Sequence, residues 1–143
     1  MSNSRRASRE TAFQFLYGLL PLPAPGGKTS DCPFSRAEFS LFCSSFEKVE
    51  DDFAWELVEG TGKNLPLIDQ EIHANSTNWR IERMPLVDLT VLRMGAFEIL
   101  FHPDIPKTVA INEAVDLAKK YGAEDSHAFV NGLLDKLEKK SVK

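Results

Sequence analysis

DIPKTVAINEAVDLAKKYGAEDSHAFVNGLLDKL, residues 104–137, is the stretch around which the rest of the chain is organised. Apolar residues recur every three or four positions in both of its halves, which is the spacing of helices with one buried face. We expect Thr108 to cap the first helix and Asp125 or Ser126 to cap the second. Gly122 stands between them where a left-handed helix terminator is expected, because a residue without a Cβ adopts that conformation at little cost. The stretch therefore predicts two amphipathic helices in tandem.

Four further segments have the same helical spacing: residues 5–20, 35–49, 50–74 and 85–102. Ser35 and Glu38 form the pattern of a capping box at the start of the second of these segments. Pro66 removes a backbone donor from the third segment, so we expect a kink or break near residues 62–66. No segment is a convincing strand. The sequence therefore predicts an all-α fold.

Three features between and within these segments have structural interpretations. Arg93 and Glu98 lie inside the apolar segment 85–102, and we expect them to pair with each other. Trp79 is the expected core anchor where the two halves of the chain join. Residues 21–33, PLPAPGGKTSDCP, contain four prolines and two glycines and cannot propagate a helix, so we expect a linker there.

Charge is unevenly distributed along the chain. The formal net charge is −4, but residues 1–9 and residues 136–143 each carry +3, and the residues between them carry −10. Such asymmetry indicates a localised contact with a polyanion, or an acidic face for a basic protein partner. Termini whose Lys and Arg side chains are simply solvated remain the alternative.

The first predicted helix combines guanidinium groups with aromatic rings. The side opposite its apolar stripe carries Arg6, Arg9, Glu10, Phe13 and Tyr17. Such a strip suits RNA when it is exposed, because Arg binds phosphate bidentately and bases stack on aromatic rings. The sequence leaves open the alternative that another helix buries Phe13 and Tyr17 while the arginines are solvated.

The sequence contains no recognisable catalytic or metal-binding pattern. Its three histidines are scattered, and it has no C-x-x-C motif and no glycine-rich phosphate loop after a strand. Cys32 and Cys43 are expected to be free thiols. The acidic run from Glu47 to Glu59 lacks the spacing of an EF-hand, so we expect it to be solvated or to face a protein. We expect neither a catalytic site nor a metal site.

Membrane and targeting signals are also missing from the sequence. No apolar run approaches the roughly 20 residues that span a bilayer. The basic N-terminus is not followed by the apolar region and cleavage site of a signal peptide. We therefore expect a cytoplasmic protein with no membrane partner.

Residues 81–137, which include VDLTVLRMGAFEIL, INEAV and FVNG, closely resemble the bacterial transcription antitermination factor NusB family. Residues 5–17, RRASRETAFQFLY, are similar to the opening of the same family, and the resemblance is loose between residues 18 and 80. It implies a single domain, residues 1–143, built as an all-α bundle of about seven helices in two packed helical subdomains, about 1–78 and 79–143. It also implies no enzymatic activity and no cofactor.

The resemblance further implies an RNA-binding antitermination factor. Family members bind the boxA element of ribosomal RNA leader transcripts together with NusE, a ribosomal protein, and promote processive rRNA transcription. Other Nus factors and RNA polymerase are indirect partners. Five residues match RNA-contacting positions of the family: Arg5, Arg6, Arg9, Asp125 and Phe129. Three match positions associated with the NusE-facing surface: Tyr17, Glu82 and Asp88.

Two other readings stay open at this point. The same helical domain type is found as the RNA-binding accessory of ribosomal RNA cytosine methyltransferases, so the chain can be a stand-alone module related to it, and we expect no catalytic domain here. The chain can also be a dimerisation module, in which Phe13 and Tyr17 are buried in a homodimer.

Overall fold

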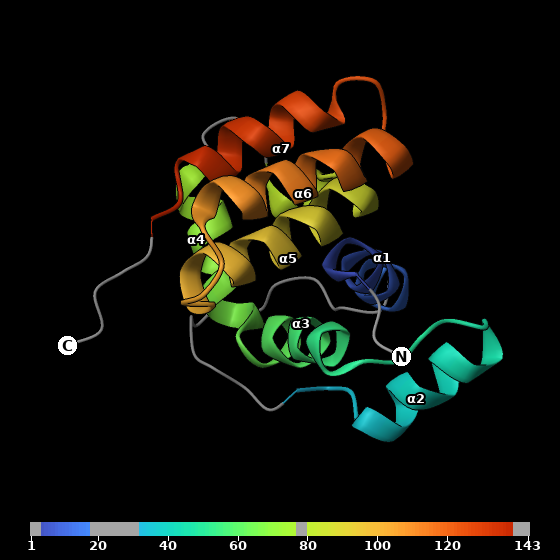
Figure 1. Ribbon diagram of the computed structural model, residues 1–143. Coiled ribbons are helices and arrows are strands. Elements are labelled where there is room, and N and C mark those ends of the chain that lie inside the picture. The colour runs from blue at the N-terminus through green and yellow to red at the C-terminus, as the bar shows by residue number, and fades with distance from the viewer. Residues whose placement is uncertain (1–3, 18–31, 77–79, 139–143) are drawn as a thin grey trace.

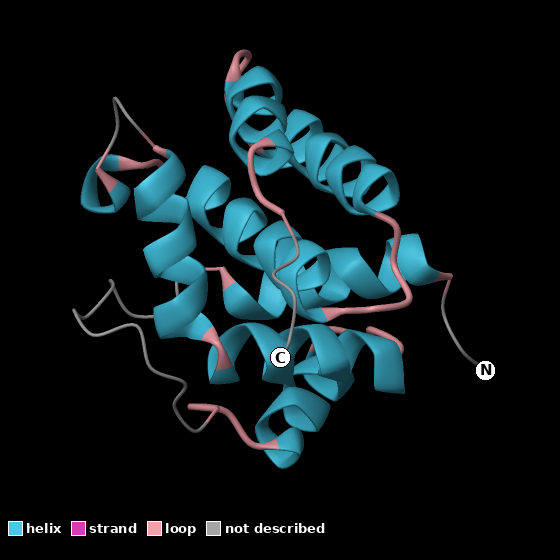
Figure 2. Cartoon of the chain, turned by 90° about the vertical axis from the view of Figure 1, so that its left-hand side faces the viewer, coloured by secondary structure: helices cyan, strands magenta, loops and turns pink. Residues whose placement is uncertain are grey.

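The computed structural model describes residues 4–17, 32–76 and 80–138, and every regular element within them is a helix (Figures 1 and 2). The elements are α1 (Arg5–Leu16), α2 (Arg36–Ser45), α3 (Asp52–Lys63), α4 (Leu65–Asn75), the short 3₁₀ helix η1 (Ile81–Arg83), α5 (Leu86–Phe101), α6 (Lys107–Tyr121) and α7 (Ser126–Asp135). The all-α prediction with about seven helices is confirmed. Trp79 and most of the expected linker at 21–33 lie outside the described residues.

Helix α5 is the centre of the structure, and it packs against α1, α3, α4, α6 and α7 (Figure 1). All residues from Asp88 to Ile99 are buried, so the helix has no solvent-facing side over most of its length. Gly95 allows α7 to approach closely, because a Cβ at this position would lie 2.8 Å from Leu134 Cδ1. One hydrophobic cluster includes residues from helices on both sides of α5, and the division into two subdomains stays a prediction.

Local signals at two helix ends are confirmed by the structure. The Ser35 side chain accepts a hydrogen bond from the backbone N–H of Glu38, whose carboxylate accepts from the backbone N–H of Ser35. The expected break in segment 50–74 occurs at Asn64, just before Pro66. Both features depend on residues a few positions apart, which is why sequence spacing alone predicts them.

Gly122 and Asp125 stand at the expected helix ends, but neither makes the expected kind of cap. Gly122 has φ −96° and ψ −172°, which is extended backbone and not the left-handed conformation. The absence of a side chain at Gly122 makes room for Ser126, because a Cβ there would lie 2.7 Å from Ser126 Oγ. That hydroxyl accepts a hydrogen bond from the backbone N–H of Ala123, so it joins the two helices, and the N-terminal positions of α6 and α7 have no side-chain cap. Thr108 lies inside α6, and the Asp125 side chain makes no capping bond.

Two buried ion pairs connect α5 to its neighbours, and neither is the expected pair between Arg93 and Glu98. Arg93 donates to both carboxylate oxygens of Asp69 in α4, at 2.9 and 2.8 Å. Glu98 accepts from Arg9 in α1, at 2.7 Å for the shortest contact. Five residues turn a helix by about 140° beyond one full turn, so Arg93 and Glu98 point toward different neighbours.

Burial opposes the charge on both of these carboxylates. It raises the pKa of the Asp69 carboxyl, and the hydrogen bonds from Arg93 act against that shift. It likewise raises the pKa of the Glu98 carboxyl, with the Arg9 guanidinium acting against it. The two ion pairs therefore add little net stability, and their main effect is to specify which helices pack together.

The helices also bear on the question of a membrane. Within the described ranges, none is long and apolar enough to cross a lipid bilayer.

Candidate nucleic-acid interface

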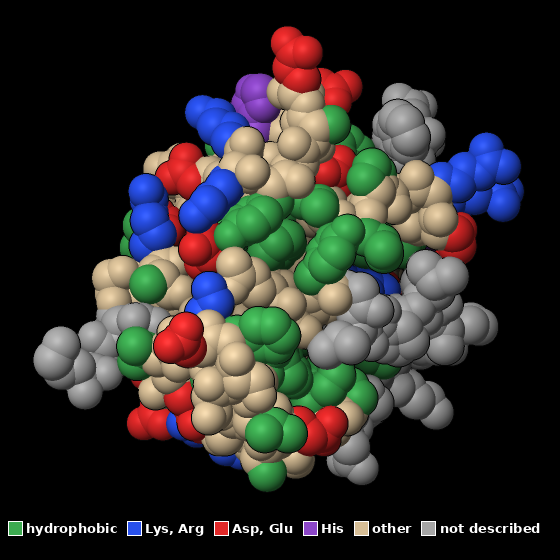
Figure 3. Space-filling model, turned by 90° about the vertical axis from the view of Figure 1, so that its right-hand side faces the viewer, with side chains coloured by type: hydrophobic (Ala, Val, Ile, Leu, Met, Phe, Trp, Pro, Cys, Tyr) green, Lys and Arg blue, Asp and Glu red, His purple; other side chains and the backbone are tan. Residues whose placement is uncertain are grey.

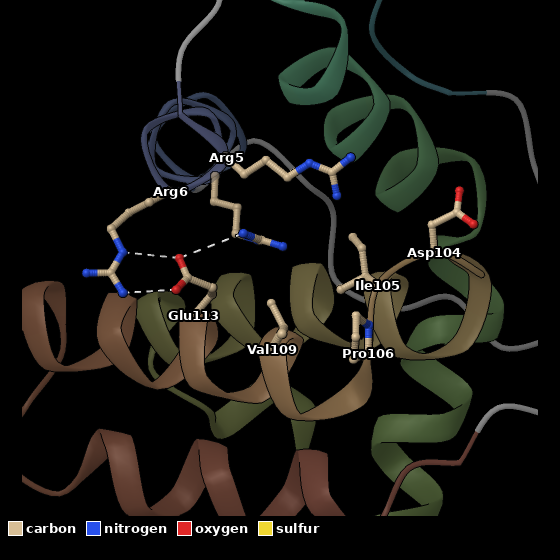
Figure 4. A pocket seen from close by; sticks show the side chains of 8 residues that line it. Arg5, Arg6, Asp104, Ile105, Pro106, Val109 and Glu113 are labelled. Carbon is tan, nitrogen blue, oxygen red and sulfur yellow. Dashed lines mark hydrogen bonds and ion pairs between the residues drawn. The ribbon is translucent and has the colours of Figure 1, made fainter.

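A depression of about 270 Å³ opens where the start of α1 faces the α5–α6 connection and the first turns of α6 (Figure 4). It is lined by Arg5, Arg6, Arg9, Asp104, Ile105, Pro106, Val109 and Glu113. Apolar side chains from the connection and from α6 form one wall, and guanidinium groups from α1 form the other (Figure 4). The Ser4 hydroxyl starts α1 at this edge by accepting a hydrogen bond from the backbone N–H of Ala7. An apolar wall beside guanidinium groups can hold a base and a phosphate together.

Arg5 is exposed at the rim of the depression and reaches toward α3 (Figure 4). Its guanidinium carbon lies 4.4 Å from the centroid of the Phe53 ring. This cation–π contact orients the side chain without neutralising its charge. Arg5 therefore keeps its charge and its hydrogen-bond donors available to an anion.

Arg6 is also exposed, but two carboxylates of α6 hold its guanidinium. Nη2 donates to Glu113 Oε2 at 2.9 Å and to Asp116 Oδ2 at 2.6 Å, and Nε donates to Glu113 Oε1 at 3.3 Å. The hydrogen bond and the charge of Glu113 raise the pKa of Arg6 above its ordinary value, with Asp116 adding to the shift. The side chain is accessible to solvent, yet its charge is already matched within the protein.

Arg9 does not lie on an exposed strip, and this part of the expectation is wrong. The residue is 4% exposed, and its guanidinium donates to both oxygens of the Glu98 carboxylate. Phe13 is buried as well, with its ring centroid 4.8 Å from that of Tyr121. Neighbouring helices cover α1 on most sides. The helical spacing of its residues in the sequence therefore could not show which of its polar side chains face water. Arg9 lines the depression but is bonded to Glu98, so it also holds α1 against α5.

Asp125 and Phe129 lie at the start of α7 and are not among the residues that line the depression. Asp125 is exposed, whereas Phe129 is partly buried and packs against the hydrophobic core. Arg6 contacts the middle of α6, while Asp125 follows the C-terminal end of that helix. The structure therefore does not gather all five RNA-matched residues into one cavity, and a ligand that touched all of them would have to extend along α6.

The three residues matched to a NusE-facing surface differ in accessibility. Tyr17 is 45% exposed at the end of α1, and Glu82 is exposed in η1. Asp88 is only 5% exposed, and its Oδ1 atom has no hydrogen-bond partner. Asp88 is therefore the least accessible of the three residues.

Glu113, Asp116 and Phe53 belong to the interface although the sequence did not assign them to it. Glu113 and Asp116 lie in the first of the two helices predicted from residues 104–137. Their three-residue spacing puts two carboxylates on one face of α6, which is a detectable signal for a cation partner. Nothing in the sequence indicates that this partner is Arg6, which lies more than 100 positions away.

The surroundings of the interface are of mixed charge. The face in Figure 3, which includes the sides of α1, α2 and the α6–α7 connection, shows basic and acidic side chains around a central group of hydrophobic ones. Over the described part of the chain, no group of three or more His, Cys, Asp or Glu side chains could hold a metal ion.

Comparison with known proteins gives a consistent result across most of the chain. The model of the NusB family matches residues 6–139. The transcription antitermination protein NusB of Myxococcus xanthus (strain DK1622) is 46% identical over 137 residues, which cover 94% of each chain. The corresponding protein of Geotalea daltonii is 43% identical over 147 residues, again covering 94% of each.

Solved structures agree with the sequence comparison. NusB of T. maritima has a TM-score of 0.69 and 32% identity, covering 95% of this chain and 91% of that one. A chain in the crystal structure of antitermination factors NusB and NusE in complex with dsRNA has a TM-score of 0.71 and 28% identity, covering 92% of both. The helical fold, the family match and the identity to these relatives agree, and the chain belongs to the NusB family.

Proposed function

We propose that this chain is a non-enzymatic transcription antitermination factor, which binds the boxA element of ribosomal RNA leader transcripts together with the ribosomal protein NusE. In this role it promotes processive rRNA transcription in the cytoplasm and meets other Nus factors and RNA polymerase indirectly. The observation that carries the proposal is the depression at the start of α1, where exposed guanidinium groups face an apolar wall. A relative of the same fold has been solved with NusE and dsRNA.

The RNA contact proposed for the chain is small. Arg5 and Arg6 supply exposed guanidinium groups, and Arg9 holds α1 in place from the core. Two phosphate contacts give modest affinity that falls with salt. Asp125 and Phe129 extend the proposed RNA path toward α7. A net charge of −4 makes binding to RNA alone weak, so a second ligand on the same RNA would strengthen it.

For NusE we propose a surface that includes Tyr17 and Glu82, whose side chains are accessible. A basic ribosomal protein complements the acidic middle of the chain, which carries −10 between its basic ends. Asp88 is buried, so any part it has in this contact is indirect, through the position of the start of α5.

The decisive experiment is binding to a boxA-like single-stranded RNA over a range of salt concentrations, with and without NusE. Replacing both Arg5 and Arg6 by Ala should weaken RNA binding roughly tenfold or more at low salt and flatten its salt dependence, because two phosphate contacts are lost. Addition of NusE should strengthen binding by the unmodified chain.

The control is circular dichroism of the doubly substituted chain, which should retain its helical spectrum because both side chains are exposed. Unchanged RNA affinity in the substituted chain would exclude the start of α1 as the RNA site. Equal binding with and without NusE would contradict the antitermination role and favour a stand-alone RNA-binding module.

A further inference from the structure

The contacts of Arg6 are unusual for a residue offered to a polyanion. Its guanidinium touches two carboxylates, Glu113 at 2.9 Å and Asp116 at 2.6 Å. Arg9 balances these charges only in part, because its close partner is Glu98 in the core and it lies 3.7 Å from Glu113. A phosphate that approaches Arg6 therefore meets one positive and two negative groups.

These contacts leave Arg6 accessible. The side chain of Arg6 is 68% exposed and that of Asp116 is 46% exposed. Ion pairs as exposed as this add little to the stability of a fold. The arrangement is therefore better explained by its effect on a ligand than by its effect on folding.

The carboxylates occupy the edge of the guanidinium that an anion would use. A guanidinium binds phosphate most strongly with two parallel N–H donors. Glu113 takes the edge formed by Nε and Nη2, and Asp116 takes a second position on Nη2. A phosphate must displace one carboxylate or accept the remaining donors beside two negative charges.

We propose that Asp116 and Glu113 compete with RNA phosphate for Arg6, and that Asp116 thereby limits the affinity of this chain for RNA. RNA binding exchanges a carboxylate for a phosphate at Arg6, so the contact releases less free energy than an unpaired arginine would provide. Asp116 is the partner that exchanges, because it is exposed and holds Arg6 by one oxygen. Glu113 is more buried and also lies 3.7 Å from Arg9, so it stays in place. This inference rests on the proposed function of the same site.

The test is Asp116→Asn, measured by fluorescence anisotropy with a boxA-like single-stranded RNA oligonucleotide at several KCl concentrations. Asn keeps an oxygen acceptor for Arg6 and nearly the same volume, and it removes only the charge. Affinity should rise by about three- to fivefold at low salt, the effect of one charge about 4 Å away in water. The slope of log affinity against log salt should steepen by up to about 0.7, the increment for one phosphate contact on a single strand.

Two further variants distinguish competition for Arg6 from a general effect of the protein's net charge on RNA binding. Asp104→Asn makes the same charge change at a residue that lines the depression away from Arg6 (Figure 4), and it should raise affinity by less than about twofold. Arg6→Ala combined with Asp116→Asn should bind no better than Arg6→Ala alone, because the competition needs both partners. Thermal unfolding followed by circular dichroism checks that each variant is folded.

The outcomes are distinguishable. Unchanged or weaker RNA binding by Asp116→Asn would overturn the inference while leaving the proposed function intact, provided that the unmodified chain binds the RNA. A gain that persists without Arg6, or that Asp104→Asn equals, would also overturn it. Failure of the unmodified chain to bind the RNA at low salt, with or without NusE, would overturn the proposed function and the inference together.

Discussion

Arg9 and Glu98 join α1 to α5 through a bidentate contact in which both side chains are almost wholly buried. The cost of removing two charges from water is largely offset by their attraction and their hydrogen bonds. Loss of one partner leaves the other charge buried and unpaired, which is far less favourable than the intact pair. The same residue type thus has different roles at positions 5, 6 and 9 of one short helix.

For the single residue Arg9, we predict that Arg9→Ala lowers the free energy of unfolding by about 3–5 kcal/mol, because Glu98 is left as an uncompensated buried charge. Urea unfolding followed by circular dichroism at 222 nm measures the change. Arg6→Ala is the matched control, since the same substitution at an exposed position should leave the unfolding midpoint nearly unchanged. Equal unfolding midpoints for the two variants would show that burial of Arg9 does not matter.

Helix α2 packs mainly against α1, and two kinds of contact attach it to the rest of the structure. Aromatic rings hold one side, with Phe15 of α1 in edge-on contact with Phe39 and Phe42 at centroid distances of 5.2 Å. The Glu50 carboxylate holds the other side, accepting from Arg36 Nε and from the Ser40 hydroxyl, each at 2.6 Å. The polar contact connects α2 to the residues that precede α3.

The contact at Glu50 should depend on pH. The hydrogen bond from Ser40 and then that from Arg36 lower the pKa of Glu50 below its ordinary value of 4.5. A lowered folded-state pKa means that the carboxylate contributes stability above the ordinary value, and that this contribution is lost as the pH falls through the folded-state pKa. Glu50→Gln should therefore destabilise the protein at pH 7, and the difference from the unmodified chain should shrink below about pH 4.

Urea unfolding at pH 7 and at pH 3.5 measures this difference, which we expect to be about 1 kcal/mol or less at neutral pH because the pair is partly exposed. Glu47→Gln is the control, being an exposed carboxylate only three positions away. A difference for Glu50→Gln that does not change with pH would mean that the substitution acts through packing and not through charge.

At the scale of the whole molecule, the proposed RNA and NusE contacts use different side chains. Glu82→Lys reverses a charge on the proposed NusE surface, and we expect it to weaken NusE binding by about three- to tenfold, mainly through slower association. RNA binding in the absence of NusE should be unaffected. Surface plasmon resonance with immobilised NusE measures both the affinity and the association rate.

Glu59→Lys gives the same change of net charge on the exposed side of α3 and serves as the control. It should reduce NusE binding much less, because the proposed surface lies at Tyr17 and Glu82. Equal losses for the two variants would show that net charge, and not position, governs the association with NusE.

Sequence patterns predicted the elements of this fold well and their connections poorly. The capping box at Ser35 and the break before Pro66 were correct because each depends on neighbours a few residues away. The prediction of a left-handed conformation at Gly122 was wrong. A glycine is also required where a Cβ would collide with a neighbour, and Ser126 is that neighbour here. The pairing of Arg93 with Glu98 was wrong because each has a closer partner on another helix.

The sequence by itself determined that the chain is all-helical, where most helices begin and end, and that it resembles the NusB family. Those properties follow from local periodicity and from motifs that can be read along the chain. Only the tertiary structure decided that Arg5 is available, that Arg6 is held by Glu113 and Asp116, and that Arg9 is buried. The physical reason is that accessibility and ion pairing depend on which helices meet in space, and residues 6 and 113 meet only after folding.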